Sequence, residues 1–458
     1  MSRARVARWA IVSRVCLLAL QLVANNLIPD HVGSMNDVFM KDMRTPPHSG
    51  IAEVLLGGMD NWDAEYFIFI SEHGYKYEQA MAFFPLLPST MWLVSRTLLL
   101  PLSLFMPGRS IALVSGVVIN FAAFVAAAVA LYELTMEIFQ SRKLSLISAA
   151  LFCINPASVF MSAVYSEAVF TCLSLWGMLC VQRGRPARAC ALFALATATR
   201  SNGAVLCGYL GFYYLKKLYE VLHTHPVAPQ LCLLKSLGLV SLALLQCCAV
   251  VLPFALFQYY GHMSFCGKDV IPPSPWCQWR LPLPYFYIQQ HYWDVGFMRY
   301  YQWKQVPNFL LATPMFLLCL YSLFKGTIHM LSSKSTKSFD LVLFPFLLHL
   351  LFLVFFGIFN MHVQVLTRFV ASSSPVIYWF AGGALLDTLP SNCDVPDSLC
   401  QLGAAIFQRR PKESHSISNR LTPVWVWLQM TTGQLIVCYF CVYYFIGCVV
   451  HCNFLPWT

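Results

Sequence analysis

Charged side chains are scarce in this sequence. Asp, Glu, Lys and Arg make up 11% of its 458 residues, against about 25% in soluble globular domains. Hydrophobic residues make up 58%, and the mean hydropathy is +0.61. Because a soluble chain of this length could not cover its surface with so few charges, the composition excludes a soluble globular protein. Apolar windows such as 341–359 and 437–450 instead predict helices that cross a bilayer, which takes about 20 apolar residues.

Several patterns that would indicate other functions are absent. The sequence has no N-x-Ser/Thr sequon and no pair of CxxC motifs of the kind that binds zinc. The formal net charge of +10 is spread over short basic clusters between apolar runs, as in cytosolic loops, so we expect no nucleic acid partner. Most of the 18 Cys residues lie in apolar runs, where Cys acts as a small hydrophobe. Cys266 and Cys277 lie in a polar loop and can pair in an oxidising lumen.

The basic clusters also predict the orientation of the chain. Arg3, Arg5 and Arg8 precede the first apolar stretch, and no small-x-small cleavage site follows it. We therefore expect a retained first helix whose amino end is cytosolic. Placing the later basic clusters in the cytosol as well gives about 11 crossings. The predicted crossings are 9–28, 110–139, 144–161, 168–182, 187–201, 203–218, 236–257, 306–325, 340–358, 369–389 and 423–449.

The same rule singles out one apolar segment. If 83–106 crossed the membrane, Arg142 and Lys143 would lie in the lumen. The segment contains several prolines, which break or bend helices, so we predict a re-entrant or surface-lying helix on the luminal side. The alternative is an ordinary crossing with a local exception to the rule. The whole chain is predicted to be one all-α integral membrane domain, 1–458, with luminal loops at 29–109 and 258–305 and a cytosolic loop at 390–422.

Acidic residues are concentrated in the first predicted luminal loop. Nine of the 20 Asp and Glu residues fall within 30–78. Inside this stretch, 61–73 has the apolar spacing of an amphipathic helix. Asp60 or Asn61 is the expected N-cap, and Gly74 is the expected C-terminal stop. Such a helix would lie along the luminal face of the membrane with its apolar side down.

Two groups of acids are candidates for chemistry. Asp63 and Glu65 fall in the first turn of the expected helix, where the positive helix end favours carboxylates, and Asp63 is expected at the mouth of a cavity leading to lipid. The alternative is that they only cap the helix and solvate its outer face. Glu167 is the only acid between Glu137 and Glu220. A carboxylate beside a span is costly unless it is functional or paired, although it could also serve as a helix cap.

Two arginines at predicted luminal helix ends are candidates for binding phosphate. Arg200 is followed by Asn202, and Arg368 comes shortly after Gln364. Luminal arginines run against the positive-inside trend, and guanidinium binds phosphate bidentately; the alternative is snorkelling to lipid headgroups. His73 is a further luminal candidate for contact with substrate, although a lone His is more often structural. No His-x-x-x-His or His-Asp spacing predicts a metal site.

This combination of residues suits more than one class of protein. A transferase with a lipid-phosphate donor uses a carboxylate base to activate an acceptor hydroxyl and cations to stabilise the departing phosphate. A lipid flippase or transporter would distribute its charges along a central pathway, whereas the acids here cluster on one face. A non-catalytic subunit of a transferase complex would not need Asp63 at all. Composition alone does not separate these classes.

Short motifs in chain order resemble one family of membrane enzymes, the PIG-V family of GPI mannosyltransferase 2. The resemblance extends from the first luminal loop to the last residue. The motifs are Trp62-Asp63-Ala64-Glu65, Glu72-His73-Gly74-Tyr75, Phe83-Phe84-Pro85, Asn155-Pro156-Ala157-Ser158, Tyr165-Ser166-Glu167, Thr199-Arg200-Ser201-Asn202-Gly203, Thr367-Arg368-Phe369 and the terminal residues 451–458.

The resemblance implies a GT-C glycosyltransferase of the endoplasmic reticulum membrane with a bundle of about 11 helices. Such an enzyme takes mannose from dolichyl-phosphate-mannose in the lumen and adds the second mannose, in α1,6 linkage, to a GPI-lipid acceptor. Because the donor is β-linked, an α product means inversion, and a single displacement needs one base. The close alternative is a sister enzyme that adds a different mannose or glucose. A small accessory subunit is compatible with the resemblance.

The resemblance also implies roles for the candidate residues. Asp63 matches the acid of the first luminal loop on which GT-C enzymes depend, and it is the expected base. Glu65 stands where an acid-x-acid pair would have a second Asp. Glu167 matches the acid of the second luminal loop and is expected to orient acceptor or donor. A divalent metal is compatible with the resemblance but is not supported by the residues, since Arg200 and Arg368 can neutralise the departing phosphate instead, and the donor substrate is dolichyl-phosphate-mannose.

Overall fold

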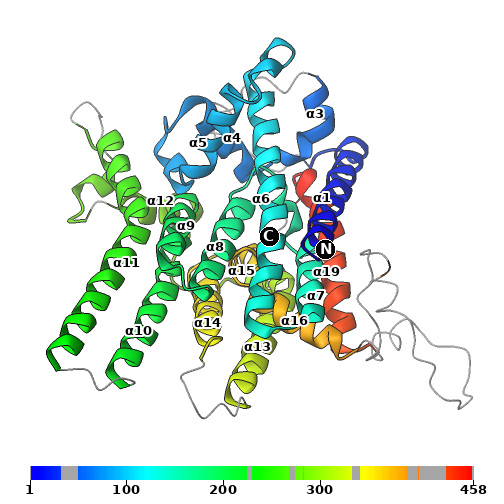
Figure 1. The fold of residues 1–458 in the computed structure, drawn as a ribbon. Coiled ribbons are helices and arrows are strands. Elements are labelled where there is room, and N and C mark those ends of the chain that lie inside the picture. Colours follow the sequence, from blue (N-terminus) through cyan, green and yellow to red (C-terminus); the bar gives the residue numbers. More distant parts are fainter. Residues whose placement is uncertain are drawn as a thin grey trace, which may run out of the picture.

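The computed structural model describes residues 2–31, 50–223, 229–267, 274–281, 283–332, 341–388, 401 and 430–455. Within these ranges every regular element is a helix and no β-strand occurs, so the predicted all-α class is confirmed. Figure 1 shows a bundle of helices, with the short helices α3, α4 and α5 gathered at one end. Apart from Gln401, the predicted cytosolic loop 390–422 lies outside the described residues.

Several helices in the described part of the chain are long and apolar enough to cross a membrane, which makes the protein a multi-pass membrane protein. Two of them, α11 and α13, contain an internal proline, which neighbouring helices and local adjustments make tolerable at membrane depth. These long helices are α1 (Ser2–Leu27), α6 (Gly108–Phe139), α11 (Pro229–Phe265), α13 (Val306–Ser332) with the 3-10 turn η7 (Trp303–Gln305) before it, and α19 (Thr432–Cys452).

Other predicted crossings form helices of 17 residues or fewer. At about 1.5 Å per residue, these are shorter than the roughly 30 Å hydrocarbon core. The predicted number of about 11 crossings is therefore not confirmed. The shorter helices are α7 (Arg142–Cys153), α8 (Glu167–Gln182), α9 (Pro186–Thr199), α10 (Cys207–His223) and α14 (Phe344–Phe359).

The predicted crossing at 369–389 is not one straight helix. The 3-10 turn η8 (Val363–Val365) leads into α15 (Leu366–Ser373), and α16 (Val376–Leu386) follows at an angle of 82°. The break falls at Ser374, which is extended, and at Pro375. Because proline has no backbone N–H and clashes with the preceding helical turn, it cannot continue α15. Because of this bend, α15 and α16 point in different directions.

The first predicted luminal loop is built from short helices. The segment 83–106, predicted to be re-entrant or surface-lying, forms the 11-residue helix α5 and a 3-10 turn, and neither is long enough to cross a bilayer. The elements of this region are α3 (Ile51–Leu56), η1 (Gly57–Met59), α4 (Asp63–His73), η2 (Glu78–Ala82), α5 (Leu86–Arg96) and η3 (Leu100–Leu104).

Helix α4 ends where the sequence predicts but begins differently. Gly74 terminates it with a φ of +72°, a left-handed value that favours glycine. The predicted N-cap is wrong: Trp62 precedes the helix, and no side chain caps it. The side chains of Asp60 and Asn61 are engaged elsewhere, because Arg109 donates to the Asp60 carboxylate at 2.6 Å and Asn61 donates to carbonyls at the end of α19.

A second group of short elements lies at the same end of the bundle as α4 and α5 (Figure 1). Helix α11 continues to Phe265 and thus into the predicted loop 258–305. The 3-10 turn η6 (Pro275–Gln278) and helix α12 (Pro284–Trp293) follow. A disulfide joins Cys266 to Cys277, the pair that the sequence analysis considered. This group packs against η2 of the first predicted luminal loop.

Helix α6 forms the centre of the bundle and packs against α1, α7 and α8. Helix α19, from the other end of the chain, lies beside α1, as Figure 1 shows. Helix α8 also contacts α15, which precedes the bend. Helix α19 contacts the 3-10 turn η4 (Ser158–Met161). These packings bring the starts of α4, α8 and α15 and the end of α19 to one region.

Candidate active site

A cavity of about 790 Å³ lies where these elements meet. Its wall includes the start of α4, the turn before α8, the segment after α9, helix α12, the start of α15 and the end of α19. Most residues that the sequence analysis proposed for the site line this cavity: Asp63, Glu167, Arg200, Asn202, Gln364 and Arg368.

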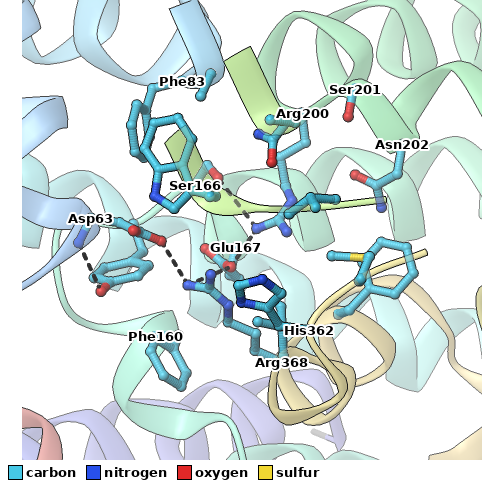
Figure 2. Close-up of a pocket in the computed structure, with 18 of the residues that line it drawn as sticks. Asp63, Phe83, Phe160, Ser166, Glu167, Arg200, Ser201, Asn202, His362 and Arg368 are labelled. Carbon is cyan, nitrogen blue, oxygen red and sulfur yellow. Dashed lines mark hydrogen bonds and ion pairs between the residues drawn. The ribbon is translucent and has the colours of Figure 1, made fainter. Parts of the chain in front are cut away.

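An acid from α4 and an arginine from α15 form an ion pair in the cavity. Arg368 Nη1 donates to Asp63 Oδ2 at 2.8 Å. The same Nη1 lies 4.0 Å from Glu167 Oε1, so Arg368 stands between two carboxylates, as Figure 2 shows. The Asp63 side chain is 30% exposed and that of Arg368 is 17% exposed. Asp63 is thus held in place by Arg368 and remains open to the cavity.

The second acid has a different environment. Glu167 is the first residue of α8 and its side chain is only 2% exposed. Its Oε1 forms an ion pair with Nη1 of Arg200, which also donates to the Ser166 hydroxyl at 3.4 Å. The positive end of α8 adds to the attraction for this carboxylate. Burying a charge is costly unless it is paired, and Glu167 is paired with Arg200 and lies near Arg368.

Aromatic rings surround the ion pairs. The Arg368 guanidinium lies over the rings of Phe160 and Tyr165, at 5.3 and 5.7 Å from their centroids, a cation–π arrangement that favours the charged form. The Tyr165 hydroxyl accepts from the backbone N–H of Asp63 at 3.2 Å and donates to the carbonyl of Asn61 at 3.3 Å. Burial raises the pKa of Tyr165 well above its usual value, so it stays a neutral donor that fixes the turn before Asp63.

The turn between α9 and α10 is tied to neighbouring elements. Asn202 Nδ2 donates to Ser373 Oγ at 3.1 Å, which joins the turn to α15. Ser201 Oγ donates to the Tyr285 hydroxyl at 2.8 Å, which joins it to α12. Because Arg200 precedes these two anchors, its guanidinium is directed toward Glu167 (Figure 2).

Another part of the cavity wall is polar and aromatic. The Tyr300 hydroxyl donates to Gln364 Oε1 at 3.0 Å and accepts from Asn308 Nδ2 at 2.7 Å. The ring of Tyr300 stacks on His362 with their centroids 4.5 Å apart. Gln364 therefore lines the cavity, while its carbonyl oxygen is already engaged by the protein.

Two predicted site residues lie outside the cavity. Glu65 follows Asp63 by two residues in α4, and two helical steps of 100° place it on another side of the helix. His73, the last residue of α4, is exposed, and its ring packs against Phe69 at 4.9 Å. Among the described residues, no group of three or more His, Cys, Asp or Glu is placed to hold a metal ion.

The structure also adds residues that the sequence analysis did not propose. Phe83, Trp293, His362 and His451 line the cavity. Phe83 and His451 fall in motifs of the family resemblance, but a motif does not show which of its side chains points inward. Trp293, the last residue of α12, and His362, between α14 and η8, lie outside these motifs, and their place in the cavity wall depends on contacts between distant segments.

Membrane-length helices around a cavity with two acids and two arginines define a polytopic membrane protein with an enzyme-like polar site. The family model described as "Mannosyltransferase (PIG-V)" matches residues 3–458. GPI alpha-1,6-mannosyltransferase 2 of Cricetulus griseus is 38% identical, and that of Homo sapiens is 37% identical; each alignment covers 100% of this chain and 99% of the relative. GPI mannosyltransferase 2 of Drosophila melanogaster is 34% identical over 84% of this chain and 92% of the relative.

The chain belongs to the PIG-V mannosyltransferase family and is a glycosyltransferase. Among solved structures, the oligosaccharyltransferase of Archaeoglobus fulgidus is similar with a TM-score of 0.47 and 13% identity, covering 98% of this chain and 56% of the other. A TM-score below 0.5 does not establish a common fold. The assignment therefore rests on the sequence comparisons.

Proposed function

We propose that this protein transfers mannose from dolichyl-phosphate-mannose to a GPI-lipid acceptor, adding the second mannose in α1,6 linkage with inversion. The names of its relatives support the acceptor and the linkage. The observation that carries the chemistry is the ion-pair network of Asp63, Arg368, Glu167 and Arg200 in one cavity. A flippase or a non-catalytic subunit is not favoured, because the relatives of this chain are named as transferases.

In the proposed mechanism, Asp63 is the general base. Its carboxylate takes the proton of the acceptor hydroxyl while that oxygen attacks C1 of the donor mannose. The bond between C1 and the phosphate oxygen breaks, and its electron pair leaves with dolichyl phosphate. The new bond forms on the face opposite the leaving group, so a β-linked donor gives an α product. Asp63 is the better candidate because it is 30% exposed, whereas Glu167 is 2% exposed.

The two arginines are proposed to stabilise the departing phosphate. A guanidinium has five N–H donors in a planar fork that matches phosphate geometry. Among the described residues, all contacts of Arg200 and Arg368 with the acids run through their Nη1 atoms. The Nη2 group of each guanidinium can therefore bind the phosphate oxygens as their negative charge grows. Glu167 is proposed to position both arginines, and the leaving group needs no metal ion in this scheme.

The site is proposed to face the lumen of the endoplasmic reticulum, with the amino terminus in the cytosol. Arg3 and Arg183, both predicted to be cytosolic, pair with the same residue, Glu133. The disulfide of Cys266 and Cys277 lies in the group of elements that helps to line the cavity, and disulfides persist in oxidising compartments. A small accessory subunit is compatible with the family resemblance.

Mannose transfer in microsomes tests this proposal. Microsomes from cells that lack the endogenous enzyme are complemented with the wild type or with Asp63→Asn, supplied with labelled dolichyl-phosphate-mannose, and the GPI intermediates are separated by size. The wild type should extend the one-mannose intermediate. Equally expressed Asp63→Asn should be slower by about 10²- to 10⁴-fold, the usual contribution of a general base. Glu220→Gln, in an exposed pair on α10, should be unaffected.

Two outcomes would contradict the proposal at different levels. Full activity of Asp63→Asn would remove Asp63 as the base and make Glu167 the candidate. A wild type that extends no intermediate would overturn the proposed acceptor or donor.

A further inference from the structure

The last turn of α19 brings one side chain into the cavity for which the proposed mechanism has no role. His451 lines the cavity beside Asp63 and Arg368, and only 1% of the residue is exposed. Its Nε2 has no hydrogen-bond partner among the described residues. Buried polar atoms in proteins are nearly always hydrogen-bonded, and an unmet one costs about 1–3 kcal/mol.

A buried imidazole with an unpartnered nitrogen is not by itself a binding site. His349 in α14 is also buried, and its Nε2 likewise has no partner among the described residues. The ring of His349 is held by the Tyr209 hydroxyl, 3.0 Å from Nδ1, and it does not line the cavity. What distinguishes His451 is that its unpartnered nitrogen belongs to a side chain in the wall of the site.

The surroundings of His451 fix its position relative to the proposed base. Its ring packs edge-on against Phe160 and Tyr165, with centroids 5.3 and 5.5 Å apart. These are the two rings over which Arg368 lies. The carbonyl of His451 accepts from Asn61 Nδ2 at 3.1 Å, two residues before Asp63. The imidazole and the base are therefore held by one set of contacts.

We propose that the His451 imidazole hydrogen-bonds a sugar hydroxyl bound beside Asp63, which makes His451 a further substrate-binding residue. This inference rests on the proposed function, because it takes the substrate to be a mannose derivative. A neutral imidazole can donate through one ring nitrogen and accept through the other, and a hydroxyl can do both. The charges of the two acids and the two arginines already cancel. The neutral imidazole of His451 is therefore the suitable partner for an uncharged hydroxyl.

The hydroxyl can come from two sources, the donor mannose or the acceptor mannose. Kinetics with each substrate varied separately distinguish them. If His451 binds the acceptor, its loss raises the KM for the GPI intermediate and leaves the KM for dolichyl-phosphate-mannose unchanged. If His451 binds the donor, the two effects are exchanged.

The test uses the full-length protein and three substitutions at this position. His451→Phe keeps an aromatic ring but has no nitrogen, His451→Leu removes both, and His451→Gln keeps an amide N–H and C=O. We expect kcat/KM for one substrate to fall roughly ten- to hundredfold in the Phe and Leu variants, as for a lost hydrogen bond in a binding site. The Gln variant should stay within several-fold of the wild type. His349→Phe, a matched buried imidazole outside the cavity, should leave both KM values unchanged.

The outcomes separate this inference from the proposed function. A wild type without mannose transfer overturns the proposed function. An active wild type together with unchanged kcat/KM in His451→Phe or His451→Leu overturns the role of His451. Equal losses in the Gln, Phe and Leu variants show that His451 is structural and also overturn it. If one apolar variant does not fold in a thermal unfolding assay, the other apolar variant gives the answer.

Discussion

Arg368 Nη1 lies 2.8 Å from Asp63 Oδ2, although 305 positions separate the two residues in the chain. The contact joins the bent segment α15 to the first turn of α4. Because the same nitrogen lies 4.0 Å from Glu167, one guanidinium sets the position of the proposed base relative to the second acid. The spacing of the three charged groups depends on the bend after α15 as much as on the residues themselves.

Replacing Arg368 should affect both stability and catalysis. In Arg368→Gln, Asp63 and Glu167 lose a shared positive partner, and the free energy of unfolding should fall by about 1.5–3 kcal/mol, as for a hydrogen bond to a charged group. Mannose transfer should fall by at least about 10²-fold, the usual effect of removing one group that stabilises developing charge. Arg368→Lys keeps the charge but not the planar fork, so its activity should be intermediate. The transfer assay and thermal unfolding in detergent measure the two effects.

Arg299→Gln is the matched control for this prediction. Arg299 pairs with Asp294 at 3.0 Å, but both side chains are well exposed, at 43% and 66%. Exposed ion pairs contribute about 0–1 kcal/mol, so little change is expected. An Arg368→Gln variant as active as Arg299→Gln would remove Arg368 from the mechanism.

Glu167 and Arg200 should act as one unit. If Glu167 serves to hold Arg200, then Glu167→Gln and Arg200→Gln should each lower activity strongly, and the double variant should lose little more than either single variant. A double-mutant cycle on log kcat/KM measures this, and residues in direct contact typically couple by about 0.5–3 kcal/mol.

The same cycle with Arg200 and Glu78 is the comparison. Glu78 contacts a different set of residues, so its effect should add to that of Arg200 within about 0.5 kcal/mol. Additive effects of Glu167→Gln and Arg200→Gln would show that the ion pair has no joint role.

The sequence singled out four charged residues that line the cavity, but it did not show how they pair. Asp63, Glu167, Arg200 and Arg368 stand out because acids, and arginines at predicted luminal helix ends, are rare in such an apolar chain. Their pairing depends on contacts between distant segments, which periodicity does not report. His451 was missed as a site residue for the same reason, since its position follows from the packing of α19 against η4.

Local rules failed where tertiary contacts overrode them. Asp60 was a sound N-cap candidate by residue type, but Arg109 takes its carboxylate. Glu65 was grouped with Asp63 by sequence spacing. Residues two positions apart in an α-helix point to different sides, so the two acids lie on different sides of α4. The predicted crossing at 369–389 had the right hydropathy, yet Pro375 breaks it. The stop at Gly74 was predictable because its left-handed φ is a local requirement.

Glu78 should position the wall of the cavity through η6 and α12. Its carboxylate accepts from the Ser274 hydroxyl, from Trp276 Nε1 at 3.2 Å and from the Tyr292 hydroxyl at 2.7 Å. Burial and then the Glu78 carboxylate raise the pKa of Tyr292 above its usual value, so this phenol stays a donor. In Glu78→Ala the three donors lose their acceptor. The KM for at least one substrate should rise several-fold, and the melting temperature should fall.

The comparison for Glu78 is Glu220→Ala, which removes an exposed carboxylate on α10. Tyr292→Phe should show a smaller effect than Glu78→Ala, since it removes one hydrogen bond, which contributes about 1 kcal/mol to stability. Unchanged KM values and melting temperature in Glu78→Ala would mean that η6 and α12 are held by the disulfide and apolar contacts alone.

Gly203 should be required for the turn that carries Arg200 and Asn202. A Cβ at this position would lie 2.4 Å from the backbone nitrogen of Thr197, a distance that no side-chain adjustment can relieve. Gly203→Ala must therefore shift the turn away from α9, and we expect a loss of about 1–3 kcal/mol of stability, as for other overpacked sites, with a strong loss of transfer. Gly211→Ala in α10 meets no atom within 4 Å and should be neutral or stabilising by up to about 1 kcal/mol. Thermal unfolding and the transfer assay are measured on both variants. Equal stability and equal activity of Gly203→Ala and Gly211→Ala would show that the close approach of the turn to α9 does not position Arg200.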